Sequence, residues 1–225
     1  MRLTQLAVAG ADALAELQAR RAAYAQTGEY PILIGEAPAA ESFLEFDADP
    51  TNDSDEVLLA SESIDVEGWI QTKRGEWEEE EEIDIESYLG GWPGEMADKG
   101  SIRVHTNVLN NQIRPEVELI LAKIDQPWKL PAVVRFGGWN DCPESEVLCA
   151  FFRRWQERYG AEIVALHNDL IECTVKNPPR DEAAAMELAW EQFWFCFDIV
   201  DQGYETVQNL AATLLNSDYW YFWWD

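Results

Sequence analysis

The stretch EIVALHNDLIECTV (162–175) decides the fold, because it places two short apolar runs on either side of a tight polar turn. Each run has the length and side-chain pattern of a strand, and Asn and Asp are typical turn residues. The spacing therefore predicts two strands, 162–167 and 170–175, joined as a hairpin. Because helical patterns precede and follow this hairpin, the order of elements is typical of an α+β protein.

Three helices and a terminal strand are predicted around the hairpin. One helix begins near Asp141 and ends at Gly160, a second opens in PPRDEAAAM (178–186), and a third includes Leu210. The chain then closes on YWYFWW (219–224), in which both alternating sets of side chains are aromatic. A strand with two apolar faces needs cover on both sides, so we expect this C-terminal aromatic strand to be buried in the sheet.

The first half of the chain has weaker patterns. Residues 3–27 suit a helix that stops at Gly28, and residues 63–77 suit another. Residues 47–56 and the Gly-rich segment 89–100 are predicted to be loops. Short apolar or alternating runs predict further strands, at 30–35, 42–46, 101–109, 116–124 and 131–136. The last three of these strands are expected to form an antiparallel meander.

Together these patterns predict an α+β fold with a mainly antiparallel central sheet and packed helices. Two organisations fit the change in composition near residue 100. In the first, residues 1–100 form an acidic N-terminal region with a helix, short strands and an acidic loop, and residues 101–225 form an α+β domain. In the second, the two regions form one continuous fold.

Acidic residues dominate the charge, since 43 Asp and Glu stand against 16 Lys and Arg for a formal net charge of −27. The window 41–98 holds 20 of these acids and two bases, Lys73 and Arg74. A field of this sign repels nucleic acid and anionic membranes and attracts basic proteins. A solvated face that only keeps the protein soluble is the alternative.

Partner-binding residues are expected in this acidic window, because its carboxylates are interleaved with aromatic side chains that could anchor a partner. The candidates are Asp53, Asp55, Glu56, Glu78, Glu79, Glu80, Glu81, Glu82 and Trp77. The five successive glutamates repel one another, so we expect a solvated helix end or a mobile loop there. The alternative is a solvated surface with its aromatic side chains buried.

A candidate pocket lies elsewhere, where FGGWND (136–141) could meet the hairpin turn. Trp139, Asn140 and Asp169 would line it, although a turn into the following helix explains the first two better than a pocket does. His167 beside Asp169 could act as an acid–base pair, or the two could simply belong to the turn.

Enzymatic chemistry has little support in the sequence. A carboxylate-based enzyme would need Asp169, Glu187, Glu191 and Asp198 to converge in one cleft. The sequence contains no phosphate-binding loop and no nucleophile motif, and its four cysteines and two histidines lack zinc-type spacing. No catalytic residue, metal or cofactor is therefore predicted.

The expected compartment is the cytoplasm. The four cysteines are scattered over apolar segments, as buried reduced thiols would be. The N-terminal apolar run is interrupted by Asp12 and Glu16, which favours a helix over a signal peptide. No stretch approaches the roughly 20 apolar residues of a membrane span.

Several C-terminal segments resemble a bacterial family known as domain of unknown function 4253. These segments are PWKLPAVVRFGGWNDCP, RWQERYGAEIVAL, LIECTVKNPP, LAWEQFWFCFDIVDQG and the terminal WYFWWD. The resemblance covers about residues 116–225 and implies no activity. Small acidic cytoplasmic families of this kind often look like immunity proteins of bacterial toxin systems, which is an analogy of class alone.

The expected function is therefore non-enzymatic protein binding. The most specific form of this hypothesis is an immunity-type inhibitor that neutralises a basic bacterial toxin, such as a secreted effector, by covering its active site. Two alternatives stay open: a carboxylate-based, metal-assisted enzyme, and a structural or oligomeric scaffold. The sequence does not predict the oligomeric state.

Overall fold

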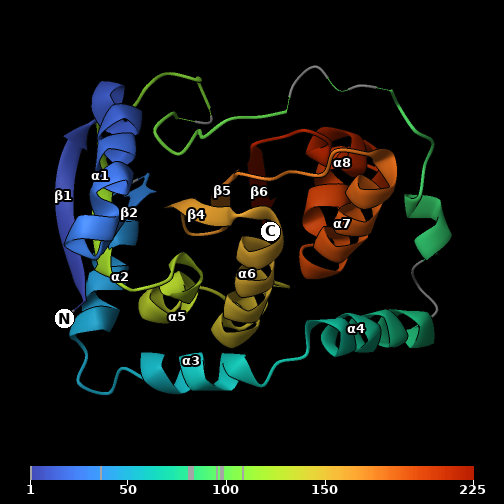
Figure 1. Cartoon of the computed structure of the whole chain (residues 1–225), viewed down its shortest axis with the longest axis horizontal. Helices are drawn as coiled ribbons and strands as arrows, with labels where there is room; N and C mark the ends of the chain where they lie inside the picture. The colour runs from blue at the N-terminus through green and yellow to red at the C-terminus, as the bar shows by residue number, and fades with distance from the viewer. Residues whose placement is uncertain (1, 36, 81–83, 95, 97–98, 108) are drawn as a thin grey trace.

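The computed structural model describes residues 2–35, 37–80, 84–94, 96, 99–107 and 109–225. These residues include one mixed sheet of six strands in the order β1-β3-β2-β4-β5-β6 (Figure 1). The strands are β1 (Leu3–Ala9), β2 (Glu29–Ile34), β3 (Glu116–Lys123), β4 (Ala161–Leu166), β5 (Leu170–Val175) and β6 (Tyr219–Trp223). Neighbouring strands are antiparallel except β2 and β4, which run parallel. The predicted α+β class is confirmed, with a mixed sheet rather than a purely antiparallel one.

Helices cover both faces of the sheet. On one face, Ala13 and Leu17 of α1 (Ala13–Thr27) share a buried cluster with Leu33, Leu119 and Val164. The other face carries the larger core, most of whose helical residues come from α2 (Ala37–Ala48), α5 (Leu130–Val134), α6 (Ser145–Tyr159), α7 (Glu182–Phe195) and α8 (Val207–Leu214). The apolar surface removed from water in these two clusters is the main driving force for folding.

Two further helices, α3 (Ser54–Glu62) and α4 (Val66–Glu80), form an outer layer along one side of the molecule (Figure 1). They pack mainly against α5, α6 and α7. Trp69 of α4 meets Phe151 of α6 edge to face, with ring centroids 5.2 Å apart. This layer therefore has an inner side fixed to the core helices and an outer side left to solvent.

The terminal aromatic residues form strand β6, as predicted, but the strand lies at an edge of the sheet rather than inside it. The side chains of Trp220, Phe222 and Trp224 are buried, whereas the alternate set is half-buried. This second set carries polar atoms that need partners, and the Tyr219 hydroxyl donates to Glu172 at 2.7 Å. The two sets of aromatic side chains in β6 therefore have different environments: one set faces the core, and the other lies partly in solvent.

Residues 3–27 form β1, a short 3-10 helix (Gly10–Asp12) and α1, and not the single predicted helix. The strand β1 pairs with β3 over its whole length, from Leu3 opposite Ala122 to Ala9 opposite Glu116. At the end of β1, a Cβ on Gly10 would lie 1.9 Å from the carbonyl oxygen of residue 114, so the two segments approach closely only because this residue is glycine. Pairing with β3 outweighed the helical spacing of the leucines. A local sequence pattern does not show which distant strand a segment pairs with.

Three predicted strands are not strands, so the predicted meander is wrong. Residues 42–46 lie in α2, residues 131–134 lie in α5, and the described part of 101–109 contains a single isolated bridge. In this last segment, residues 103 and 104 donate their backbone N–H groups to the side chain of Glu172 instead of to a strand. The predicted hairpin, the strands at 30–35 and 116–124 and the helix at 63–77 agree with β4–β5, β2, β3 and α4.

Candidate functional site

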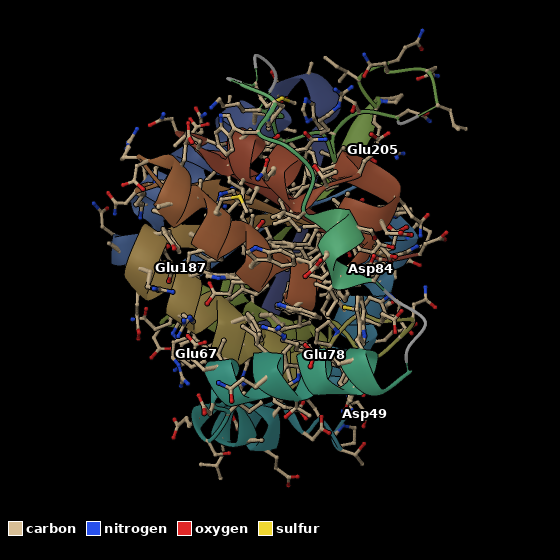
Figure 2. The ribbon with its side chains drawn as sticks, turned by 90° about the vertical axis from the view of Figure 1, so that its right-hand side faces the viewer. Asp49, Glu67, Glu78, Asp84, Glu187 and Glu205 are labelled. Carbon is tan, nitrogen blue, oxygen red and sulfur yellow. The ribbon has the colours of Figure 1, made fainter. Side chains whose placement is uncertain are left out.

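The outer side of α3, α4 and the turn that follows is rich in exposed carboxylates, and we call it the acidic helical face. Its members are Asp55, Glu56, Glu62, Asp65, Glu67, Glu76, Glu78, Asp84 and Glu86. Figure 2 shows Glu67 and Glu78 along α4 and Asp84 beyond its end. Two basic residues lie among them, and each is paired locally: Lys73 with Glu76 at 3.3 Å and Arg74 with Glu78 at 2.7 Å. The face therefore keeps a large negative charge.

Ion pairs attach this layer to the rest of the chain. Asp53, just before α3, pairs with Arg135, and Asp55 pairs with Arg2 at 2.7 Å. Exposed pairs of this kind contribute only about 0.2–1 kcal/mol each, so they orient the layer more than they stabilise it. With Glu78, three of the predicted binding residues are thus paired within the chain, whereas Glu56 is exposed and has no ion pair among the residues that the structure describes.

Trp77, the predicted aromatic anchor, is half-buried against α7 and the segment that follows it. Its ring meets Phe193, Trp194 and Phe197 edge to face, with centroids 5.7, 5.4 and 4.7 Å apart. This indole therefore fastens α4 to the core. The apolar side chain that the acidic helical face presents to solvent is a different one.

That side chain is Leu59 of α3, which is 70% exposed. It lines a shallow hollow together with Glu56, Ala60, Glu62 and Ser63. The sequence prediction missed it because residues 47–56 were assigned to a loop and no helix was predicted after them. A signal was present, however, since three successive apolar residues at 57–59 cannot all face the core from one helix.

The glutamate run ends α4. Glu78 is exposed, and Glu79 and Glu80 complete the helix. Glu81 and Glu82 lie outside the described residues. The predicted helix end is thus seen for the first three glutamates.

The FGGWND segment forms a turn that leads toward α6. Trp139 packs edge to face on Phe136 at 4.7 Å, and both line a hollow of about 310 Å³ together with Asn168 of the hairpin turn. Asn140 adopts a left-handed backbone conformation with φ 46°, which asparagine tolerates better than most residues. Trp139 therefore does lie beside the hairpin turn, but Asp169 lines a different pocket.

Asp169 belongs to a pocket of about 250 Å³ at the end of the hairpin. Its Oδ2 accepts a hydrogen bond from Trp223 Nε1 at 3.2 Å, and its Oδ1 lies 3.5 Å from His167 Nδ1. Arg103 and Glu172 line the same pocket. An imidazole held by a carboxylate that is itself held by an indole is an arrangement suited to proton transfer.

Glu172 is the most enclosed carboxylate of this pocket, and burial raises its pKa above the usual value. Three donors oppose this effect: the Tyr219 hydroxyl and the backbone N–H groups of Arg103 and Val104, at 2.7, 2.7 and 3.0 Å. The side chain thereby ties the irregular segment at 103–104 to strands β5 and β6. Its role here is structural.

The remaining carboxylates of the enzyme hypothesis are all engaged within the chain, and Glu187 and Glu191 share Arg158 as a partner. Glu187 pairs with Arg158 at 2.8 Å, and buried Glu191 accepts a hydrogen bond from the Trp155 indole at 2.7 Å. Asp198 accepts the backbone N–H of the last residue at 2.9 Å. In the described part of the chain, no three metal-ligating side chains come together.

All four cysteines are buried free thiols. Burial raises the pKa of each thiol, to about 12 for Cys149 and further for Cys173 and Cys196. A thiol acts as a nucleophile only as the thiolate, so none of these side chains is activated for catalysis.

Comparison with known proteins adds one finding. Residues 118–225 match the model of a family described as a domain of unknown function (DUF4253), which confirms the resemblance expected over about residues 116–225. The match begins within β3 and includes the hairpin, α5 to α8 and the terminal strand. No curated protein and no solved structure matches the chain. Among the described helices, none is long and apolar enough to cross a membrane.

Proposed function

We propose that this protein is a non-enzymatic binding module that captures a basic protein through the acidic helical face. The observation that carries this proposal is Leu59, a large apolar side chain standing 70% exposed on α3 between the exposed carboxylates Glu56 and Glu62. An apolar centre with a charged rim is the usual anatomy of a protein interface. The leucine would fill a pocket of the partner, while the rim carboxylates would steer a basic surface toward it.

The most specific form of the proposal is an immunity-type inhibitor of a bacterial toxin. An enzyme that acts on nucleic acid or nucleotides needs a basic cleft, because its substrate is anionic. A surface with many carboxylates is complementary to such a cleft and would exclude the substrate from it. The four reduced, buried thiols support action in the cytoplasm, where such an inhibitor would protect its host.

A capture experiment followed by binding measurements on the purified pair tests the proposal. The tagged protein is used to isolate partners from the native bacterium at low salt, and the partner is then expressed and its affinity measured by calorimetry. The variant L59A should weaken binding by about tenfold, and E56K/E62K by at least that factor. Binding should also weaken as salt rises, and the bound partner should lose its enzymatic activity.

The matched control is E41K/E45K, which makes the same change of charge at two exposed positions of α2. It should bind nearly as well as the natural sequence. Equal affinities for E56K/E62K and E41K/E45K would show that the acidic helical face is not the interface, and a captured partner with an acidic binding surface would contradict the proposal as a whole.

One observation favours a second function, namely proton transfer by His167. Trp223 and Asp169 together hold the imidazole in a pocket, which would make Asp169 an orienting group and His167 the general base. A panel of p-nitrophenyl esters and phosphates offers a first assay. Turnover that H167Q abolishes and D169N lowers would establish this role, whereas turnover equal in both variants would remove it.

A further inference from the structure

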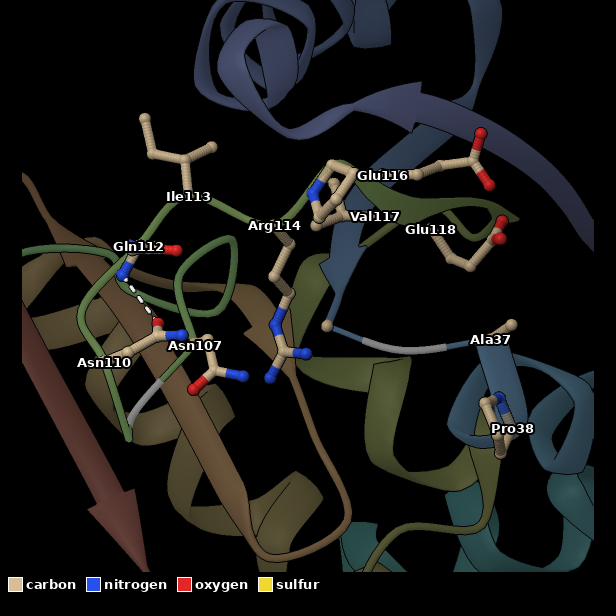
Figure 3. A pocket seen from close by; sticks show the side chains of 12 residues that line it. Ala37, Pro38, Asn107, Asn110, Gln112, Ile113, Arg114, Glu116, Val117 and Glu118 are labelled. Atoms are coloured by element: carbon tan, nitrogen blue, oxygen red, sulfur yellow. Dashed lines mark hydrogen bonds between the residues drawn. The ribbon is translucent and has the colours of Figure 1, made fainter.

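A pocket of about 420 Å³ opens where β2 ends and α2 begins. Its walls come from the start of α2 at Ala37 and Pro38, from the segment that includes Asn110 and Ile113, and from the first residues of β3 (Figure 3). It lies outside the acidic helical face and adjoins the His167 pocket, with which it shares the lining residue Arg114. No site predicted from the sequence includes it.

Glu118 of β3 gives this pocket its chemical character. The residue pairs with Ala7 of β1 on one side and Ile34 of β2 on the other, so it occupies an interior strand of the sheet. It is only 7% exposed, and its Oε2 is buried without a hydrogen-bond partner. Figure 3 shows the Glu118 side chain on the same side of the pocket as Ala37 at the start of α2. A buried carboxylate oxygen is unfavourable unless a hydrogen-bond donor meets it, and a positively charged donor neutralises its charge as well.

The other walls of the pocket indicate which kind of molecule could carry a donor group to Glu118. Ala37 and Pro38, at the start of α2, offer apolar surface for an aliphatic body. A second carboxylate, Glu116, stands exposed at the rim on the same side of β3. An ammonium group on a short alkyl chain would place its charge at Glu118 and its carbons against the apolar wall.

Arg114 also lines the pocket, but its position leaves the charge of Glu118 available. Figure 3 shows its guanidinium running along the opposite wall, away from the carboxylate. The two charged groups thus mark separate ends of the pocket.

We propose that this pocket binds a primary alkylammonium group, with Glu118 as the buried counter-ion. The inference stands apart from the acidic helical face, because it rests on a different strand and on an enclosed carboxylate rather than on exposed ones. Lysine side chains and small free amines share this chemistry.

The test uses the full chain and n-pentylammonium as the probe, titrated by calorimetry or amide NMR. Salt at about 150 mM shortens the reach of surface charge to roughly 8 Å and so suppresses non-specific attraction to an acidic protein. The natural sequence should bind the amine at one saturable site, and E118Q should bind it at least tenfold more weakly. The uncharged probe 1-pentanol should bind far more weakly than the amine.

The control variant is E41Q, which removes the same charge from an exposed position of α2 and should leave the affinity unchanged. A second variant, A37F, adds bulk at a lining position without altering Glu118 and should also weaken binding. It keeps the test valid if E118Q folds poorly. Equal amine affinities for E118Q, A37F and the natural sequence would overturn the proposal.

The free energy of unfolding provides a second readout. If the carboxylate had a purely structural role, its replacement would lower this free energy. Without ligand, E118Q should unfold at a urea concentration equal to or above that of the natural sequence, because it replaces an unpartnered buried charge. Added pentylammonium should raise the midpoint only where Glu118 is present. A destabilised E118Q whose midpoint still rises with the amine would contradict the proposed role.

Two probes separate the sources of the ammonium group. If Nα-acetyl-lysine N-methylamide binds with the same dependence on Glu118, a lysine side chain of a protein is the ligand class. If pentylammonium binds and the lysine derivative does not, the pocket selects small free amines. Either result supports the ammonium site, and failure of both probes refutes it, whatever the outcome at Leu59.

Discussion

Replacement of Phe222 by alanine tests the assignment of the C-terminal strand to the core. Its side chain is fully buried and packs on three rings: it stacks on Trp155 with centroids 5.2 Å apart and meets Phe195 and Phe152 at 5.1 and 5.9 Å. Truncation of a buried Phe to Ala typically costs about 3–5 kcal/mol, and each lost aromatic pair adds about 0.5–1.5 kcal/mol to what area alone predicts. We therefore expect F222A to lose about 4–5 kcal/mol, a large share of the roughly 5–15 kcal/mol that stabilises a typical protein.

Urea unfolding followed by far-UV circular dichroism measures this loss, with the slope of the transition as a check on two-state behaviour. The matched control is Y221A, one residue away on the half-buried side of the same strand. It removes a comparable ring and should cost only about 1–2 kcal/mol, because less apolar surface leaves water. Deletion of residues 219–225 should abolish cooperative unfolding altogether. A loss below about 1 kcal/mol in F222A, or equal losses in the two variants, would refute the placement of alternate side chains in the core.

Two further predictions concern carboxylates that hold the backbone in place. The D47A variant should be destabilised by about 1–3 kcal/mol, because Asp47 accepts the backbone N–H groups of Arg2 and Leu3 at 2.6–2.9 Å and anchors β1 to the end of α2. The control is E45A, at an exposed position of α2. Equal urea midpoints for D47A and E45A would contradict the anchoring role. Burial raises the pKa of Glu172 in the folded protein, so protonation of this side chain favours the folded state. Its contribution to the free energy of unfolding is therefore complete below the unfolded-state pKa of about 4.5 and declines as pH rises through the folded-state pKa. The difference in unfolding free energy between the natural sequence and E172Q should therefore decrease as pH rises from 4 to 7, and a constant difference would show that the pKa is not raised.

The elements that the sequence predicted are those whose signals are local. The hairpin at 162–175 combines strand-like runs with a polar turn, and helix α6 combines an apolar stripe with a glycine stop at Gly160. No distant residue is needed to read either pattern. The order of strands in the sheet has no comparable local signature, so the edge position of β6 could not be predicted from its aromatic side chains.

The errors share one physical cause, which is that short apolar runs fit either a strand or a buried helix. The run at 131–134 is buried on all sides in α5, where Pro131 occupies the first turn, a position that suits proline in a helix. Residues 42–46 were read as a strand although the buried positions of α2 follow helical spacing through Phe43 to Asp47. Length alone could not decide between the two structures.

The candidate sites were predicted unevenly for the same reason. Abundance of charge pointed correctly to where exposed carboxylates gather, because composition is a local property. Glu118 shares one side of its strand with exposed Glu116 and buried Ile120, so the local pattern does not show whether that side faces solvent. Only the pairing of β3 between β1 and β2 reveals that this position faces the interior.

Solubility alone does not explain the surface of the α3–α4 layer. Arg2, Arg135 and Arg154 pair with Asp55, Asp53 and Glu67 of this layer. The other outward carboxylates that lack such a partner repel one another, which favours solubility and gains nothing in stability. A polar residue at position 59 would serve solubility better than the exposed Leu59, so solubility does not account for this side chain. Leu59 instead stands among the carboxylates, where a docking partner would bury it. A binding surface for a basic partner explains both the leucine and the charge around it. A surface that serves only solubility explains the charge but not the leucine.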